Sequence, residues 1–292
     1  MKSIYACGVD IGGSHITAAI IELADNTILK DTVKRASIDS SKTVTEIIND
    51  WTAVIKDVLI TANGKRLNIG IAIPGPFDYD NGVSYISGQH KYEALYDVNV
   101  KTLLSEALQQ PAETITFAND AACFLQGEVA GGAAKGREDV LGFTLGTGFG
   151  SAKYENGIAE DADLWQKPFL DGIAEDYLSS RWFVKRYYQL SKKYVEGVKE
   201  LMGEYHKDEY IPIIFEEFGF NFGLFIKEII ANEEIEMIVI GGNIAQALEL
   251  FRNGINKGLI RSRNIPIIKQ SALWEHAPLI GAVNFNTLIT AL

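Results

Sequence analysis

The stretch VDIGGSHITAAII, residues 9–21, places a glycine turn between two runs of apolar and β-branched residues. This pattern predicts a strand, a tight turn at Gly12 and Gly13, and a second strand. The Rossmann fingerprint and the P-loop both need a helix directly after their glycines, whereas a β-branched run follows here. The Gly-x4-Gly-Lys-Ser/Thr pattern of the P-loop does not occur anywhere in the sequence. The stretch therefore disfavours Rossmann dehydrogenases and P-loop enzymes.

A strand–glycine–strand hairpin can bind phosphate in another way. Successive N–H groups of a tight turn point into one concave space, and glycine lets a phosphate approach the backbone closely. We expect Gly12, Gly13 and Ser14 to form such a cradle. Asp10 would repel phosphate, so we expect its carboxylate to hold Mg²⁺, directly or through water.

A second glycine turn of the same layout lies in FTLGTGFGSA, residues 143–152. Gly146, Thr147 and Gly148, with Gly150 behind them, would form its cradle. One such hairpin alone is best interpreted as an ordinary tight turn. Two of them, one in each half of the chain, favour a nucleotide held between two domains that each supply a phosphate clamp.

A third glycine feature is IVIGGNIAQAL, residues 238–248, in which a strand leads into Gly-Gly and a helix that starts around Asn243. One interpretation is a turn followed by an N-cap at Asn243. The functional alternative is a helix N-terminus that meets the nucleotide, with Gly242 leaving room for it.

Composition limits the class of protein. The chain has 292 residues, 47% of them hydrophobic, and a formal net charge of -11. This acidity disfavours binding to nucleic acid or to an anionic membrane. The two cysteines, Cys7 and Cys123, are too few and too far apart for a disulfide framework or a zinc site. Without a signal-peptide pattern or a run long enough to span a bilayer, we expect a soluble cytoplasmic protein.

Strand and helix patterns alternate along the whole chain, which predicts an α/β fold. A helix is expected within residues 42–65, where apolar residues from Val44 to Leu59 have helical spacing and Asn63-Gly64 closes the pattern; long helical segments are expected at about 175–204 and 212–231. We expect an N-terminal domain of residues 1–118, joined by a C-terminal helix at about 277–292, and a C-terminal domain of residues 119–276.

The three glycine segments resemble the phosphate-1, phosphate-2 and adenosine segments of the actin-like ATPase superfamily. PGPFD at 74–78 and FANDAACFLQGE at 117–128 follow in the order typical of the ROK family (repressors, open reading frames, kinases) of bacterial sugar kinases. The resemblance implies two ribonuclease H-like domains with a cleft between them, and ATP with Mg²⁺ as cofactors. It also implies that Gly75 of PGPFD contributes to the site that binds the sugar acceptor.

The pair Asn119-Asp120 stands where a strand pattern ends and a helix pattern begins, so a helix cap is one interpretation. In ROK sugar kinases the matching pair binds the sugar and its Asp is the general base. The resemblance therefore implies that Asp120 is the catalytic base and that Asn119 and Asp120 contact the sugar. A carboxylate that orients a hydroxyl and accepts its proton suffices for phosphoryl transfer.

The rest of the sugar site departs from the family. In DADLWQKPFLDGIAEDYLSS, residues 161–180, Asp163 stands in the place of a Glu, Gln166 in the place of a His, and Glu175 matches the Glu of the family's final segment. The cysteines of the family's zinc loop are missing and Gln is not a zinc ligand, so we expect no structural zinc. Lys91 or His90 is expected near the pocket, and His15 stands where many relatives carry Lys.

The favoured function is ATP-dependent phosphorylation of a hexose or N-acetylhexosamine, at the 6-hydroxyl. One alternative is a non-catalytic sugar-sensing ROK protein without a DNA-binding domain, because only nine residues precede Asp10. Another is an acyl or anhydro-sugar kinase of the same superfamily, which the Asn-Asp pair disfavours. The aromatic segment YLSSRWFVKRYYQL, residues 177–190, is expected to form a packed or interface helix, and the resemblance implies a homodimer.

Overall fold

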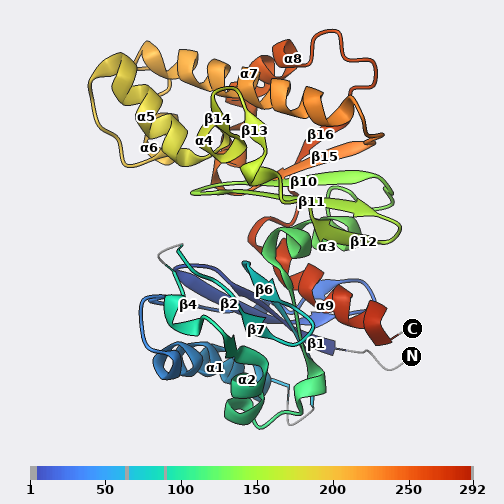
Figure 1. Ribbon diagram of the computed structural model, residues 1–292. Coiled ribbons are helices and arrows are strands. Elements are labelled where there is room, and N and C mark those ends of the chain that lie inside the picture. The colour runs from blue at the N-terminus through green and yellow to red at the C-terminus, as the bar shows by residue number, and fades with distance from the viewer. Residues whose placement is uncertain (1–4, 63–65, 89–90, 291–292) are drawn as a thin grey trace. The chain divides into compact units, whose positions relative to one another are not determined.

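The computed structural model describes residues 5–62, 66–88 and 91–290, with side chains as far as residue 285. Contacts divide the chain into two compact units. The first holds residues 1–136, 158–160 and 275–292, and the second holds residues 137–157 and 161–274. Each unit combines a sheet with helices (Figure 1), which confirms the predicted α/β class.

The sheet of the first unit is built on the predicted hairpin. Strand β1 (Tyr5–Ile11) pairs antiparallel with β2 (His15–Glu22). On its other side β1 pairs parallel with β5 (Asn68–Ile73), which pairs parallel with β9 (Ile115–Asn119). The strand order is β3-β2-β1-β5-β9, with β4 also paired to β2. The remaining strands of this unit are β3 (Thr27–Ile28), β4 (Lys34–Ser37), β6 (Phe77–Asp78), β7 (Val83–Ser84) and β8 (Val98–Asn99).

Helices cover both faces of this sheet (Figure 1). Helices α1 (Val44–Ile60) and α2 (Val100–Leu108) lie on one face, and α3 (Asp120–Gly131) and α9 (Ala277–Thr290) lie on the other. Helices α3 and α9 touch through bare glycine backbone. A Cβ added at Gly281 would overlap the carbonyl group of Cys123 on α3. This contact fixes α3, and with it the position of its first residue, Asp120.

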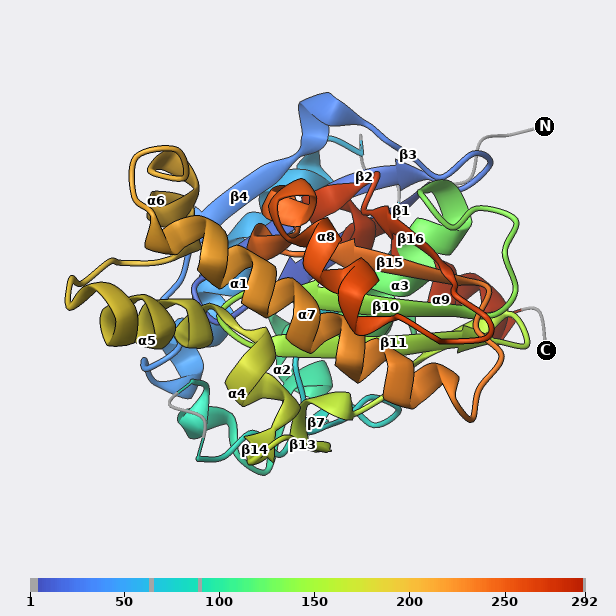
Figure 2. The same cartoon turned by 90° about the horizontal axis from the view of Figure 1, so that it is seen from above.

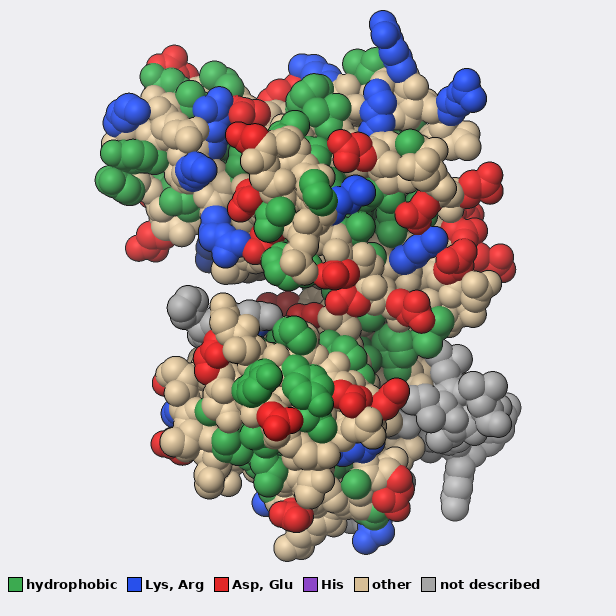
Figure 3. All heavy atoms as spheres, viewed as in Figure 1, with side chains coloured by type: hydrophobic (Ala, Val, Ile, Leu, Met, Phe, Trp, Pro, Cys, Tyr) green, Lys and Arg blue, Asp and Glu red, His purple; other side chains and the backbone are tan. Residues whose placement is uncertain are grey.

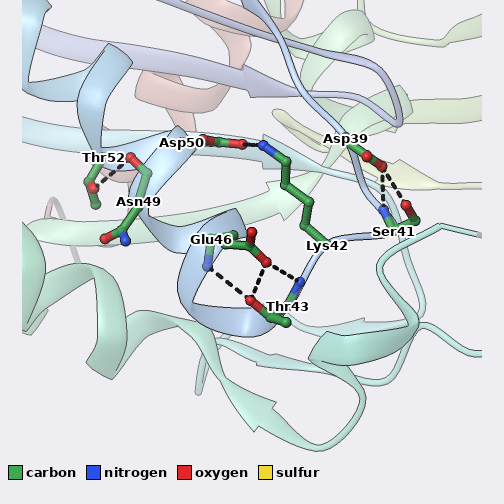
Figure 4. A network of polar contacts seen from close by, with 8 residues as sticks. All are labelled: Asp39, Ser41, Lys42, Thr43, Glu46, Asn49, Asp50 and Thr52. Atoms are coloured by element: carbon green, nitrogen blue, oxygen red, sulfur yellow. Dashed lines mark hydrogen bonds and ion pairs between the residues drawn. The ribbon is translucent and has the colours of Figure 1, made fainter.

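A network of polar contacts starts helix α1 (Figure 4). Thr43 and Glu46 form a capping box, in which the Thr43 N–H donates to the Glu46 carboxylate at 3.1 Å and the Glu46 N–H lies 3.5 Å from the Thr43 hydroxyl. The Lys42 ammonium pairs with the Asp50 carboxylate one turn further along, at 2.9 Å. Capping satisfies backbone donors that the first helical turn leaves unpaired. The α1 face that carries Trp51 is thereby held against the core.

The second unit repeats the plan. Strands β10 (Val140–Leu145) and β11 (Phe149–Glu155) form the second predicted glycine hairpin. Strand β10 then pairs parallel with β15 (Met237–Gly241), and β15 with β16 (Ile267–Gln270). The short strands β13 (Pro168–Phe169) and β14 (Gly172–Ile173) form a separate hairpin, and β12 covers Ile158–Asp161.

Helices α7 (Tyr210–Ile230) and α8 (Leu248–Gly258) run side by side over the second sheet (Figure 2). Their core is aromatic, with Phe218, Phe222 and Phe225 fully buried. Glycines on α7 and α8 let the two backbones approach, because a Cβ on Gly219 would overlap the carbonyl group of Phe251.

The long helix expected over residues 175–204 is wrong, because the structure has three helices there: α4 (Ala174–Leu178), α5 (Ser180–Ser191) and α6 (Val198–Gly203). Ser179 is extended, with φ -122° and ψ 170°, and Lys192 is left-handed, with φ 60°. Both conformations end an α-helix. The prediction that the aromatic segment packs is confirmed, since α5 buries Trp182, Phe183 and Tyr187.

The charged side chains on the surface and the lengths of the helices can be compared with the composition of the chain. On the face shown in Figure 3, acidic and basic side chains are interspersed over each unit. Within the part of the chain that the structure describes, every helix is too short or too polar to cross a membrane.

Candidate functional site

The first half of the candidate site lies at one edge of the first sheet. Strands β1, β5 and β9 run parallel, and their register sets Asp10 opposite Ala72 and Ile73 opposite Asn119. Ligands of open α/β sheets bind at the carboxyl ends of parallel strands. This edge brings together the predicted Asp10, the turn at Gly75 and the pair Asn119-Asp120, which are far apart in the sequence.

The first glycine hairpin is a closed turn beside Asp10. The Gly12 N–H donates to the His15 carbonyl oxygen at 2.9 Å, and Gly13 and Ser14 are exposed at the tip. The Ser14 hydroxyl lies 2.9 Å from Nδ1 of His15. The hydroxyl of Tyr92 donates to the Gly12 carbonyl oxygen at 2.5 Å. The tip residues are therefore exposed, while the carbonyl oxygens of Gly12 and Ser14 are held by Tyr92 and by the Ile38 N–H.

Asn119 and Asp120 have separate structural roles. Asn119 is the N-cap of α3, since its Oδ1 accepts from the Ala122 N–H at 3.0 Å, and the helix-cap interpretation is confirmed for this residue. Its Nδ2 donates to the Tyr79 hydroxyl at 3.3 Å, and a Cβ on Gly75 would lie 3.1 Å from that same oxygen. Asp120 is the first helical residue, and its Oδ1 accepts from the Ala121 N–H at 2.9 Å.

The charges at this edge favour a bound cation. The pKa of Asp10 is raised to about 7, chiefly by burial and then by the negative charges of Asp120 and Glu275, while the positive charge of Arg35 lowers it. Arg35 itself pairs with Glu275 at 2.7 Å. Burial also raises the pKa of Asp120, while the charge of Lys91 lowers it. Two partly buried carboxylates that repel each other are stabilised by a divalent cation between or beside them.

Asp10 fits the role of a Mg²⁺ ligand on its own. Across the described residues, no three His, Cys, Asp or Glu side chains form a cluster that could hold a metal ion. Mg²⁺ commonly takes one or two carboxylates and completes its shell with water and phosphate oxygens. A single half-buried Asp10 beside the Gly12–Ser14 turn is compatible with this kind of Mg²⁺ coordination.

The second half of the candidate site lies at the corresponding edge of the second sheet. Thr144 of β10 stands opposite Gly241 of β15, so the turn at Gly146 and the turn at Gly242 are neighbours. Gly242 has φ 81°, and a Cβ there would overlap the carbonyl group of Leu145. Only glycine satisfies both the conformation and the close approach.

A pocket of about 1310 Å³ opens at this second edge. Among the predicted nucleotide-binding residues it is lined by Gly146, Thr147 and Asn243. The predicted N-cap at Asn243 is wrong, because Gly242 precedes the helical turn, and the first turns, Asn243–Ala247, are 3₁₀ rather than α. The remaining wall comes from Ser180, from residues 194–200 and Met202, and from Ile244 and Gln246.

Glu175 lies against the second hairpin. Its Oε2 accepts from the Phe149 N–H at 3.0 Å, and its Oε1 pairs with the guanidinium of Arg181. The N–H of Ser180 donates to the Gly146 carbonyl oxygen at 2.8 Å. Two connections thus join the start of helix α5 to the second hairpin. One is the backbone hydrogen bond from Ser180 to Gly146, and the other is the Glu175 carboxylate, which contacts both Arg181 and Phe149.

Asp163 and Gln166 flank a short 3₁₀ turn and are exposed. Asp163 is left-handed, with φ 47°, and its N–H donates to the Asp161 carboxylate at 2.9 Å. The turn is tied to β11, because the Leu164 N–H donates to the Ser151 hydroxyl at 3.0 Å. Both side chains are therefore accessible to a ligand, and their role in sugar binding stays a prediction.

Sequence reasoning missed several residues of these edges. Three such residues lie outside the glycine motifs: Tyr92, Arg35 and Arg181. Their partners are Gly12, Glu275 and Glu175, respectively, and no local sequence rule pairs them. The sequence predicts continuous helix over residues 194–202, and nothing in that pattern indicates that the segment lines a pocket. His90 lies outside the described residues.

Comparisons with known proteins find a matching family model and relatives that align along most of the chain. The model of the ROK family matches residues 6–161. The chain is 23% identical to an N-acetyl-D-glucosamine kinase of Mannheimia succiniciproducens, covering 94% of this chain and 97% of that protein. It is 20% identical to the xylose repressor of Bacillus subtilis, covering 96% of this chain and 76% of that protein. A ROK family glucokinase from Streptomyces griseus, solved with glucose and AMPPNP, superposes with a TM-score of 0.77 at 20% identity, covering 96% and 98% of the two chains.

Proposed function

Since this chain belongs to the ROK family, we propose that it is an ATP-dependent sugar kinase. The acceptor is a hexose or an N-acetylhexosamine, phosphorylated at its 6-hydroxyl. The observation that carries the proposal is the edge of the first sheet, where parallel strands bring Asp10, the Gly12–Ser14 turn and Asp120 to one place. A carboxylate base, a metal-binding carboxylate and a phosphate cradle are the parts that phosphoryl transfer needs.

Asp120 is the general base of this proposal. Asn119 takes the helix-capping contact with Ala122, so the carboxylate of Asp120 keeps an oxygen for the acceptor hydroxyl. Because burial raises its pKa, the ionised carboxylate is a stronger base than an exposed Asp, and it accepts the hydroxyl proton as the phosphorus–oxygen bond forms.

The remaining proposed contacts divide by ligand. Mg²⁺ at Asp10 would neutralise charge on the phosphate oxygens. The sugar is held by Gly75, Asn119 and Asp120, together with Asp163, Gln166 and Glu175. The ATP phosphates and the nucleoside are bound by Gly12, Gly13, Ser14, Gly146, Thr147, Gly148, Gly242 and Asn243.

The proposal is tested by coupled measurement of ADP release with Mg-ATP against glucose, mannose, fructose, N-acetylglucosamine and N-acetylmannosamine. We expect turnover on at least one sugar, lost by at least 100-fold, on the order expected for a general base, in Asp120→Asn. Asp57→Asn, an exposed position on α1, is the matched control and should retain wild-type activity. A zinc chelator should leave the rate unchanged. Wild-type protein that binds ATP but turns over none of the sugars would refute the proposal.

The second candidate is a sugar sensor without catalysis, favoured by the similarity to a xylose repressor along 96% of this chain. It predicts a sugar that binds and shifts the melting temperature without ADP release. Calorimetric titration of the same sugars beside the activity assay separates the two functions, because a kinase consumes ATP and a sensor does not.

A further inference from the structure

Lys91 lies over the tip of the first phosphate-binding turn. A Cβ built on Gly13 would lie 3.7 Å from Cδ of Lys91, which is ordinary van der Waals contact. The ammonium group is only two bonds beyond that carbon. It is therefore held within reach of any group bound by the N–H groups of Gly13 and Ser14.

The neighbouring residue fixes Lys91 there. Tyr92 is fully buried, its hydroxyl donates to the Gly12 carbonyl at 2.5 Å, and its N–H donates to the Ser40 carbonyl at 2.9 Å. Its ring packs edge-on against Trp51, with centroids 5.3 Å apart. These three contacts hold Tyr92 behind the turn, so the backbone from which the Lys91 side chain starts is fixed beside the turn.

The charge of Lys91 also acts at this edge. Lys91 is half-buried, and its charge acts on the Asp120 carboxylate. The hairpin also carries His15 directly after Ser14, and Nδ1 of His15 is hydrogen-bonded to the Ser14 hydroxyl at 2.9 Å. A transferred phosphoryl group adds negative charge between two carboxylates, and a lysine is the point charge that offsets it.

We propose that Lys91 is a further catalytic residue, whose ammonium binds the oxygens of the phosphoryl group as it passes from ATP to the acceptor hydroxyl. This inference rests on the proposed kinase function. In the step, the acceptor oxygen forms a bond to the γ-phosphorus while the bond from that phosphorus to the bridging oxygen of ADP breaks. The hydroxyl proton goes to Asp120, and ADP leaves with the electron pair. Lys91 keeps its own proton throughout and acts by charge alone.

The test compares Lys91→Met and Lys91→Arg with Lys56→Met, an exposed lysine on α1 that serves as the matched control. Steady-state rates are measured with the sugar that wild-type protein turns over. Removal of one donor to a developing charge typically lowers kcat by about 100-fold or more, so Lys91→Met should do so with the KM for sugar within about threefold. Lys91→Arg should restore at least a tenth of kcat. Lys56→Met should match wild type.

A binding measurement keeps this inference separate from the kinase proposal. Titration with Mg-AMPPNP and with Mg-ADP measures the contribution of the γ-phosphate without turnover. Lys91→Met should weaken AMPPNP about tenfold or more and leave ADP unchanged, since only the γ-phosphate lies at Lys91. If wild type phosphorylates no sugar, the kinase proposal fails while this titration still decides the contact. Equal losses for both nucleotides, a wild-type kcat, or an effect confined to the KM for sugar would overturn the role of Lys91.

Discussion

Replacement of Tyr92 by Phe tests whether the Gly12–Ser14 turn, the proposed phosphate cradle, is held in place by the Tyr92 hydroxyl. The change keeps the buried ring and its packing against Trp51 but removes the hydroxyl that donates to the Gly12 carbonyl oxygen. A neutral hydrogen bond contributes about 1 kcal/mol, and a buried acceptor left without a donor raises the cost to about 1–3 kcal/mol. For a chain of this size, each kcal/mol lowers the melting temperature by about 2–4 °C. The variant should therefore melt several degrees below wild type.

The same loss should appear in catalysis. If the turn is preorganised by this bond, kcat/KM falls by up to the same free energy, which is about 5-fold to 150-fold. Tyr96→Phe is the matched control, because it is the same substitution on a side chain that is 57% exposed, and it should change neither property. Urea unfolding and steady-state kinetics on the three proteins decide the matter. A Tyr92→Phe protein with wild-type stability and wild-type kcat/KM would refute the anchoring of the turn.

Three further predictions concern the surroundings of the two edges. Gly281→Ala forces α9 and α3 apart and should lower the free energy of unfolding by about 1–3 kcal/mol or more, whereas Gly203→Ala, which has open space around it, should be neutral in the same urea titration. Because burial raises the pKa of Asp120, the base is lost as pH falls through that raised value, so a pH–rate profile should show its acid limb above the range of an exposed Asp. Since the carboxylate of Glu175 holds the second hairpin, Glu175→Gln should raise the KM for ATP by about threefold to tenfold, and a change confined to the KM for sugar would contradict this.

The parts of the fold that sequence could predict are those that local patterns determine. Helix α1 follows from its 3.6-residue apolar spacing and from the Thr43–Glu46 capping box, and both glycine hairpins follow from strands that flank small residues. The break at Ser179 and Lys192 could not be predicted in this way. Ser and Lys are compatible with a helix, and tertiary packing of the buried Ser179 overrides their weak preference.

The candidate site also contains some residues that local sequence patterns predict and others that they do not. Asp10, Asn119 and Asp120 could be predicted because each stands at the end of a strand, and parallel strands that end together bring their last residues together. Tyr92 could not, since its partner Gly12 is 80 residues away and no local rule pairs them. The sequence predicts Lys91 only as a residue near the pocket, and its place beside the tip of the turn at Gly13 becomes visible only in the structure.

Glu175 shows why residue type alone does not assign a role. In the sequence it matches a sugar-binding Glu, yet in the structure one oxygen accepts from the Phe149 N–H and the other pairs with Arg181. Each carboxylate oxygen can accept a second hydrogen bond, so Glu175 could bind a sugar hydroxyl beside these two partners. The Arg181 contact is the weaker of the two, because its side chain is 63% exposed and exposed ion pairs contribute little, whereas the Phe149 N–H belongs to the first residue of β11, directly after the Gly146–Gly148 turn. A sugar bound by Glu175 would thus be linked, through a single carboxylate, to the geometry of the second phosphate cradle.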